Sequence, residues 1–331
     1  MISNKFQLFL ICITAFVMSA CQKDIDTIVP NAGQLNGPDT TWYNIITAAM
    51  PVSSLKNELL YNLNLDSFQL NGGAINTYTT SSGLSLKING GALETYNGQP
   101  YFGMINAESM LLNKKGDFIR MGISTISNNS QMVSGGAFYL GLRSSTNEEL
   151  FVSQNNNIEV KFHPEDHSIQ SLGMYLGVQN NTSPFNWLPS NDITNNYVSL
   201  INDDYISVTN NLHWINCANL YNNPGVSQTK IALQIPANYT NANTVAFISF
   251  DDMQSVIAMT GNIMAEKFQS INLPVNEHVS VIVISKQGND YFLGHTNITT
   301  AYPSTQGAFQ NIQVSPVITS FANMKNYIST L

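Results

Sequence analysis

The feature that most constrains this chain of 331 residues is an alternation of apolar and polar side chains that recurs along much of its length. In an extended strand successive side chains point to opposite faces, so alternation gives the strand one apolar face and one polar face. Such strands are typical of antiparallel sheets that are buried on one side. The alternation is clear in five segments, residues 61–65, 84–88, 158–162, 230–235 and 278–284.

Turn signals separate these segments. Asn-Gly and Gly-Gly pairs tolerate the positive φ angles of tight hairpins, and they occur at residues 71–73, 89–91, 97–98 and 134–136, with a further break at 287–290. Many short strands joined by such turns predict a mainly β fold, built from antiparallel domains of the β-sandwich type.

A short helix is expected at the C-terminus. Ser315 is suited to cap a helix there, and Pro316 is suited to its first turn. Apolar residues then recur at helical spacing, namely Ile318, Phe321, Met324, Ile328 and Leu331. We predict that this helix packs on the last sheet, and we expect a second helical stretch over residues 53–59.

The length of the chain favours two domains, because about 150 residues are typical of one. The sequence Asn222-Asn223-Pro224-Gly225 is a strong break between two strand-rich regions. We therefore predict a larger β-sandwich domain over residues 57–222 and a smaller β domain over 226–331. Strands of the smaller domain are expected at residues 244–250, 255–259, 278–285 and 291–294.

Composition excludes one class of function. Charged residues make up 10% of the chain, against roughly 25% in an average soluble protein, and the formal net charge is −8. Nucleic-acid binding needs a basic surface that neutralises phosphates, and the sequence contains no cluster of Lys and Arg. We expect no nucleic-acid partner.

The N-terminal residues read as an export signal. Lys5 precedes an apolar run over residues 6–17, which is shorter than the roughly 20 residues of a membrane-spanning helix. Met18-Ser19-Ala20-Cys21 follows, and it resembles the bacterial lipobox, in which the cysteine thiol is acylated and the bond before it is cut. The resemblance implies a signal peptide over residues 1–20 and a lipid on Cys21. Two or more acyl chains would hold the protein stably on a membrane.

The residues after Cys21 bear on the side of the membrane that the protein faces. Gln22, Lys23 and Asp24 resemble the short lysine-plus-acidic signal that sends lipoproteins of Bacteroidota to the outer face of the outer membrane. The expected location is the cell surface, with the periplasmic face as the alternative. We interpret residues 21–56 as the lipidated N-terminus and a flexible tether, because much of this segment is rich in Pro, Gly, Asn and Thr.

Two longer stretches resemble a known family of extracellular β domains. Residues 84–93 alternate and end in Ala-Leu, and residues 97–103 contain a Gly-x-Pro-x-x-Gly turn. This pattern is similar to the β domain that netrin receptors and ankyrins share, although Asn89 stands where a proline is usual. The resemblance implies a β-sandwich architecture.

Two further stretches, residues 132–139 and 212–218, resemble segments of uncharacterised Bacteroidota lipoproteins of this architecture. Ala218 departs from that pattern, in which an acidic residue follows the cysteine. The family has no established catalytic residues, so the resemblance implies an architecture and a cellular location and no activity.

One segment carries possible metal ligands. His163-Pro164-Glu165-Asp166-His167 places two imidazoles and two carboxylates close together, and these groups could bind a metal such as zinc. The proline disfavours a helix here, so His163 and His167 are weak candidates, and a solvated turn is the alternative interpretation.

A second pair could in principle carry nucleophilic chemistry. His213 and Cys217 are four residues apart, so on one strand they share a face but lie roughly 13 Å apart. A Cys–His pair needs hydrogen-bond contact, so we interpret Cys217 as a core residue.

Aromatic residues are the best candidates for ligand binding. Phe185 and Trp187 lie between Pro184 and Pro189 in what we predict to be a loop, where they could stack on sugar rings. The alternative is that they pack in the core.

These observations favour a non-enzymatic lipoprotein anchored in the outer membrane, a binding or structural module of the cell envelope or surface. Its expected partner is a glycan or an envelope protein, and it uses no cofactor. The alternative is a hydrolase of unrecognised type, assisted by a metal at His163 and His167. The sequence has no motif of the common hydrolases or nucleotide-binding enzymes.

Overall fold

The computed structural model describes residues 39–61, 63–165, 169, 171–180, 183–221, 225–303, 305 and 308–331. The predicted signal peptide, Cys21 and residues 22–24 lie outside these ranges. Residues from Thr40 to Leu331 form one compact unit. Among the described residues strands make up 49% and helices 9%, which confirms the predicted mainly β fold.

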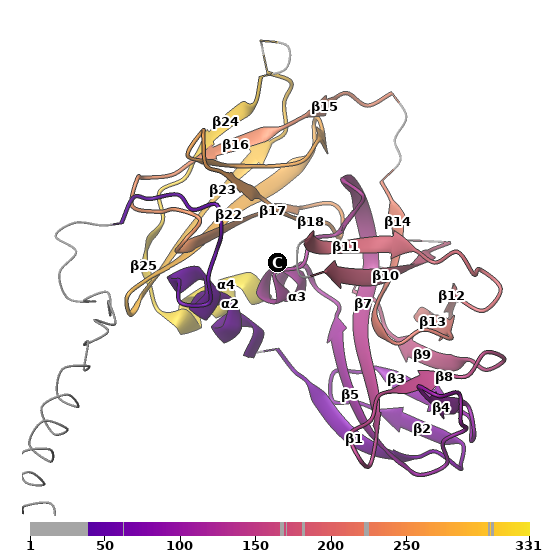
Figure 1. The fold of residues 1–331 in the computed structure, drawn as a ribbon. Helices are drawn as coiled ribbons and strands as arrows, with labels where there is room; N and C mark the ends of the chain where they lie inside the picture. The colour runs from indigo at the N-terminus through magenta and orange to yellow at the C-terminus, as the bar shows by residue number, and fades with distance from the viewer. Residues whose placement is uncertain are drawn as a thin grey trace, which may run out of the picture. The chain divides into compact units, whose positions relative to one another are not determined.

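The first half of the unit is a sandwich of two sheets (Figure 1). Its larger sheet has the order β1-β5-β7-β14-β10-β11, with β6 paired to β7. The strands are β1 (Asp66–Asn71), β5 (Met104–Leu112), β6 (Ile126–Ser127), β7 (Ser130–Ser144), β10 (Gly173–Asn180), β11 (Ser183–Pro189) and β14 (His213–Leu220).

The facing sheet has five strands in the order β12-β13-β9-β3-β2. They are β2 (Asn76–Thr79), β3 (Ser85–Ile88), β9 (Ile158–Phe162), β12 (Tyr197–Ile201) and β13 (Asp204–Thr209), and a separate pair is formed by β4 (Leu93–Thr95) and β8 (Leu150–Val152). Inward side chains of both sheets, such as Leu86 and Phe138, share one buried core. The predicted alternation over residues 158–162 therefore corresponds to a strand with the same bounds.

The second half contains two further sheets around another core. One has the order β18-β17-β22-β23-β25, and the other has the order β19-β20-β16-β24. The strands of the first are β17 (Thr244–Phe250), β18 (Val256–Ala258), β22 (His278–Gln287), β23 (Asp290–Thr299) and β25 (Val317–Thr319). Those of the second are β16 (Ile231–Gln234), β19 (Thr260–Asn262), β20 (Lys267–Gln269) and β24 (Gln310–Gln313), and a short pair is formed by β15 (Gln228–Thr229) and β21 (Leu273–Pro274).

The four strands predicted in the second half are confirmed, and three of them have the predicted bounds to within two residues. The fourth, β23, extends five residues beyond its predicted end at residue 294. One pairing is parallel, since β16 runs alongside β24, and it joins Ile231 to Gln310. This long-range pairing places β24 at the edge of the sheet that contains β16, β19 and β20.

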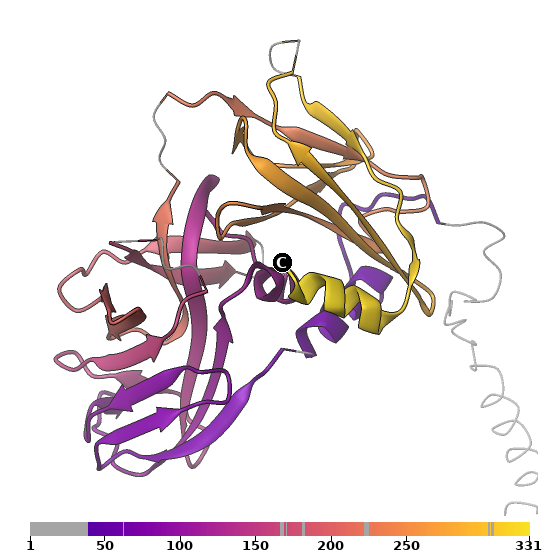
Figure 2. The ribbon, with the colours of Figure 1, turned by 180° about the vertical axis from the view of Figure 1, so that it is seen from behind.

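Within the described residues three helices occur, α2 (Pro51–Tyr61), α3 (Lys115–Met121) and α4 (Phe321–Ser329). They lie together between the large first sheet and the sheet of β17 and β22, as both views show (Figures 1 and 2). The contact between α3 and α4 is close, because Gly116 faces the backbone carbonyl of Ile328 with no room for a side chain. Side chains of the three helices share a core with both halves of the chain.

The prediction of a helix over residues 53–59 is confirmed by α2. Pro51 occupies its first position, where the missing N–H costs nothing. Val52, Leu55 and Leu59 lie on one face and are buried. Residues 61–65, predicted to be a strand, instead contain the end of α2, and the first strand begins at Asp66.

The C-terminal helix is confirmed, but its predicted start is wrong. Residues Val317–Thr319 pair with β23 as strand β25, and Ser320 caps the helix by accepting a hydrogen bond of 3.1 Å from the Asn323 N–H. The pairing partner, which is remote in sequence, keeps the segment after Pro316 extended.

The start of the folded unit also differs from the predicted tether, which extended to residue 56. The Tyr43 N–H donates to Asn241 Oδ1 at 3.0 Å, and Asn241 Nδ2 donates back to the Tyr43 carbonyl at 2.7 Å. The ring of Trp42 packs on Phe268, with 5.1 Å between centroids. Residues from Trp42 onward therefore belong to the packed unit.

Candidate ligand-binding site

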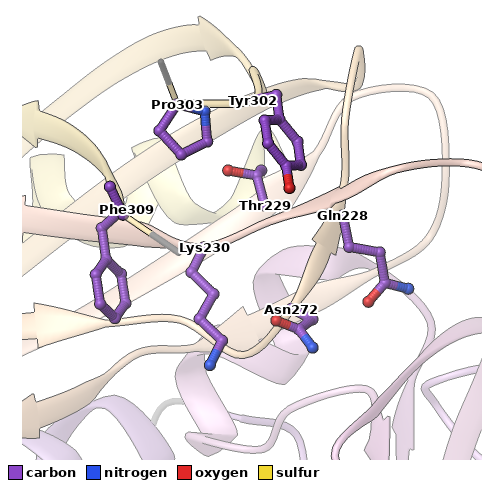
Figure 3. A pocket seen from close by; sticks show the side chains of 8 residues that line it. Gln228, Thr229, Lys230, Asn272, Tyr302, Pro303 and Phe309 are labelled. Carbon is purple, nitrogen blue, oxygen red and sulfur yellow. The ribbon is translucent and has the colours of Figure 1, made fainter. Parts of the chain in front are cut away.

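A pocket of about 280 Å³ lies where three segments of the second half meet (Figure 3). The first is β15 with the following Lys230, and the second contains Asn272 just before β21. The third contributes residues 302–303 and 308–309, which precede β24. Figure 3 shows the side chains of these segments converging on one space. We call it the Thr229 pocket.

The backbone around the pocket is held by pairing and by one glutamine. Thr229 pairs with Leu273 across the β15–β21 ladder. Gln310 fixes the segment on the other side, because its side chain accepts from the Ala301 N–H at 2.9 Å and donates to the Thr299 carbonyl at 3.0 Å. The Gln310 N–H also donates to the Lys230 carbonyl at 2.8 Å. Hydrogen bonds of Gln310 therefore connect the segments on the two sides of the pocket.

Two aromatic rings contribute to these walls. Tyr302 is 56% exposed, and Phe309 is half-buried. Figure 3 shows the rings on two sides of the pocket with the Lys230 side chain between them. An exposed aromatic face next to polar groups can stack on the apolar face of a sugar ring.

The polar lining comes from Gln228, Lys230 and Asn272, whose side chains are exposed. The two amides each offer donors and an acceptor, and the ammonium offers donors only. Pockets with a few convergent polar groups among apolar ones are typical of small-molecule sites.

Thr229 is the unusual residue of the pocket. Its side chain is 4% exposed, and its buried Oγ1 has no hydrogen-bond partner among the described residues. A buried hydroxyl without a partner costs about 1–3 kcal/mol, so most such groups are satisfied by protein, water or a ligand. A ligand hydroxyl or carbonyl that reached this oxygen would remove this cost.

The predicted metal ligands do not form a metal site within the described residues. His163 Nδ1 lies 3.1 Å from Asp204 Oδ1, and Lys161 pairs with the other oxygen of Asp204 at 3.0 Å. The hydrogen bond from Lys161 is the main cause that lowers the pKa of Asp204. His167 lies outside the described residues, within which no group of three His, Cys, Asp or Glu side chains could hold a metal.

The expectation of an exposed loop at Phe185 and Trp187 is wrong. These residues lie on strand β11, and Trp187 is fully buried with its indole N–H donating to the Ser124 carbonyl at 2.9 Å. Phe185 packs edge-on against Trp187 at 4.8 Å between centroids. The flanking prolines suggested a loop, but β11 is an edge strand of its sheet, where proline is tolerated.

Cys217 lies in the core, as predicted. It is fully buried beside Ser207, and burial raises the pKa of its thiol to about 12. His213, at the start of the same strand, instead pairs with Glu149 at 2.8 Å on an exposed surface. The two residues therefore form no nucleophilic pair.

One cluster brings a serine, a lysine, a glutamate and a tyrosine together. Lys286 donates to Ser54 Oγ at 3.0 Å and to Glu58, and Tyr291 donates to Glu58 at 2.6 Å. A serine nucleophile would need a neutral lysine as its base. The hydrogen bond to Glu58 raises the pKa of Lys286, so the ammonium stays charged and the cluster attaches α2 to β22 and β23.

The sequence did not identify the residues of the Thr229 pocket. Tyr302, Phe309 and Thr229 belong to separate segments whose local patterns carry no motif. The sequence offers one signal that could have indicated this site, an aromatic residue in a turn-rich stretch, Tyr302 before Pro303.

Comparisons with known proteins identify no relative: no protein-family model matches the chain, and no curated protein matches it. Across the described ranges, none of the helices has the length and apolar character needed to cross a membrane.

Proposed function

We propose that this protein is a lipid-anchored, non-enzymatic binding module of the outer membrane, and that it binds a hydroxyl-rich ligand of the sugar class in the Thr229 pocket. The observation that carries the proposal is the buried Thr229 hydroxyl, which has no hydrogen-bond partner among the described residues, in a pocket lined by two aromatic rings and two amides. Sugars match this lining, because their hydroxyls both donate and accept and their ring faces stack on aromatic side chains.

The low charge of the chain agrees with a neutral ligand. Lys230 is the one charged residue that lines the pocket among the described residues, and no acidic side chain lines it. The absence of a convergent acid–base set in this pocket gives no support to hydrolysis there. Binding without turnover is the function that the lining supports best.

Binding can be tested with the full chain carrying Cys21→Ser, which removes the proposed acylation site. The probes are glucose, galactose, N-acetylglucosamine and their short oligomers, monitored by saturation-transfer NMR and titration calorimetry. We expect Tyr302→Ala and Phe309→Ala each to weaken binding at least about tenfold, which corresponds to about 1.4 kcal/mol.

The matched control is Tyr96→Ala, since Tyr96 is 82% exposed and does not line the pocket. It should bind like the parent chain. Equal losses in Tyr96→Ala and Tyr302→Ala, or no binding of any sugar, would refute the assignment of the pocket.

The proposed anchor is tested separately, on cells. Protease added to intact cells should digest the wild-type protein if Cys21 is acylated and the segment Gln22-Lys23-Asp24 directs it outward. Cys21→Ser should leave the membrane fraction. Protection until the cells are lysed would overturn the surface location and favour the periplasmic face.

A further inference from the structure

A second pocket lies in the second half of the unit, and it shares no lining residue with the Thr229 pocket. Its volume is about 430 Å³, within the range typical of small-molecule sites. It is lined by α2, by β17 and by the segment from β18 to β20. We call it the Lys56 pocket.

Most of the Lys56 pocket is apolar. Val52 of α2, Val245 and Phe247 of β17, Ala258 of β18 and Phe268 of β20 contribute to its lining. Residues 43, 44 and 46 also line it, and two hydrogen bonds fix the Tyr43 backbone to Asn241. An apolar ligand could bury its body here without moving the backbone.

The lining has a single charge among the described residues, the ammonium of Lys56. Lys56 lies four residues after Val52 on α2, so both side chains share the helix face that borders the pocket. Among the described residues no acidic side chain lies within ion-pair distance of Lys56, whereas Lys114, Lys161 and Lys286 each have one. Lys56 is exposed to solvent, and partial burial by the neighbouring atoms lowers the pKa of its ammonium.

A cation without an acidic partner among the described residues, beside an apolar cavity, is complementary to one kind of ligand. An anion at Lys56 would form an ion pair with it, and a hydrocarbon body would fill the cavity. The absence of acidic side chains from the lining disfavours a cationic ligand. We propose that the Lys56 pocket binds an amphipathic monocarboxylate, with its carboxylate at Lys56 and its apolar body against β17 and β20.

The experiment compares three small probes on the full chain carrying Cys21→Ser, so that no acyl chain on the protein competes. Octanoate has the charge and the apolar body, octan-1-ol has only the body, and acetate has only the charge. Titration calorimetry should show octanoate binding at least about tenfold more tightly than octan-1-ol, and acetate should not bind measurably.

Two variants separate the charge from the cavity. Lys56→Met should reduce octanoate affinity to that of octan-1-ol and leave octan-1-ol unchanged, whereas Lys87→Met, at an exposed position of β3, should change neither. Ala258→Leu should weaken both ligands by filling the cavity. If octanoate binds no better than octan-1-ol, or if Lys56→Met binds octanoate as tightly as the parent chain, the proposal is wrong.

This inference is independent of sugar binding. Tyr302→Ala should leave octanoate affinity unchanged, because Tyr302 does not line the Lys56 pocket. A loss of octanoate binding in Tyr302→Ala would contradict the assignment to this pocket, whatever the outcome with sugars.

Discussion

Thr125 and Val256 are joined by two hydrogen bonds that connect the halves of the folded unit. The Thr125 N–H donates to the Val256 carbonyl at 2.8 Å, and the Val256 N–H donates to the hydroxyl of Thr125 at 2.9 Å. Nearby, Ser134 and Gln254 form a further backbone hydrogen bond of 2.9 Å. Polar groups that are buried between the two halves therefore satisfy one another.

Thr125→Val keeps the volume of the side chain but removes the acceptor for the Val256 N–H. Thr125 is fully buried, so the N–H would lose its partner at a cost of about 1–3 kcal/mol. Urea unfolding should show this loss, whereas Thr77→Val on the exposed edge strand β2 should shift the curve by less than about 0.5 kcal/mol. Equal effects would mean that the link contributes nothing specific.

Thr229→Val tests the Thr229 pocket without disturbing its shape. The hydroxyl has no protein partner among the described residues, so its removal should leave the free energy of unfolding unchanged or slightly increased. Sugar binding should weaken by at least about fivefold, about 1 kcal/mol, because the ligand loses one hydrogen bond. Destabilisation by more than about 1 kcal/mol would show that the hydroxyl is structural.

Trp187→Phe should separate stability from ligand binding. The substitution removes part of a fully buried ring and the hydrogen bond to the Ser124 carbonyl, at a cost of about 1–4 kcal/mol. Sugar affinity should not change, because Trp187 does not line the Thr229 pocket. If the variant kept its stability but bound sugar more weakly, the original prediction that Trp187 contacts the ligand would be supported.

Glu58→Gln should weaken the attachment of α2 in a pH-dependent way. Burial opposes ionisation of Glu58, but hydrogen bonds from Lys286, Tyr291 and Ser54 outweigh it and lower the pKa. The ionised form therefore stabilises the fold above about pH 4.5, the ordinary value, and this contribution is lost as the pH falls through the lowered pKa. The pKa of Lys286 is raised, so its contribution persists below about pH 10.5 and is lost at higher pH.

At pH 7 we expect Glu58→Gln to cost about 1 kcal/mol, a modest value because Glu58 is partly exposed. The difference from wild type should shrink in urea unfolding below pH 4. Glu165→Gln breaks an exposed pair with Lys114 and is the control, with an expected effect near zero. A pH-independent loss in Glu58→Gln would point to packing rather than charge.

Cys217 should react only when the fold opens. In a chain with Cys12→Ser and Cys21→Ser, iodoacetamide at pH 8 should label Cys217 at the rate of unfolding, because the thiol is buried with a pKa of about 12. Rapid labelling of the native protein would contradict its burial.

The raised pKa of Cys217 also predicts that the free energy of unfolding depends on pH. The folded thiol releases its proton about three units above the ordinary value of 9.0, so its contribution to stability is intact below pH 9 and falls between about pH 9 and 12. Wild type should therefore lose more stability over this range than Cys217→Ala.

The sequence alone determined much of the secondary structure. The alternation over residues 158–162 and the run over 244–250 gave strands with the observed bounds, and residues 53–59 lie within α2. These predictions succeed because a strand with one buried face, or a helix with one buried face, imposes its period on neighbouring residues. The burial of Cys217 followed from its residue type, because cysteine is among the residues that are most often buried.

The tertiary structure decided what depends on residues far apart in the chain. The segment after Pro316 became a strand because β23 pairs with it. Trp187 became fully buried and Phe185 partly buried because β11 joins the large sheet. The Thr229 pocket exists only because β15, β21 and the segment before β24 meet in space. Local periodicity determines which face of an element is apolar, but only long-range pairing and packing determine what that face contacts and which polar groups remain without a partner.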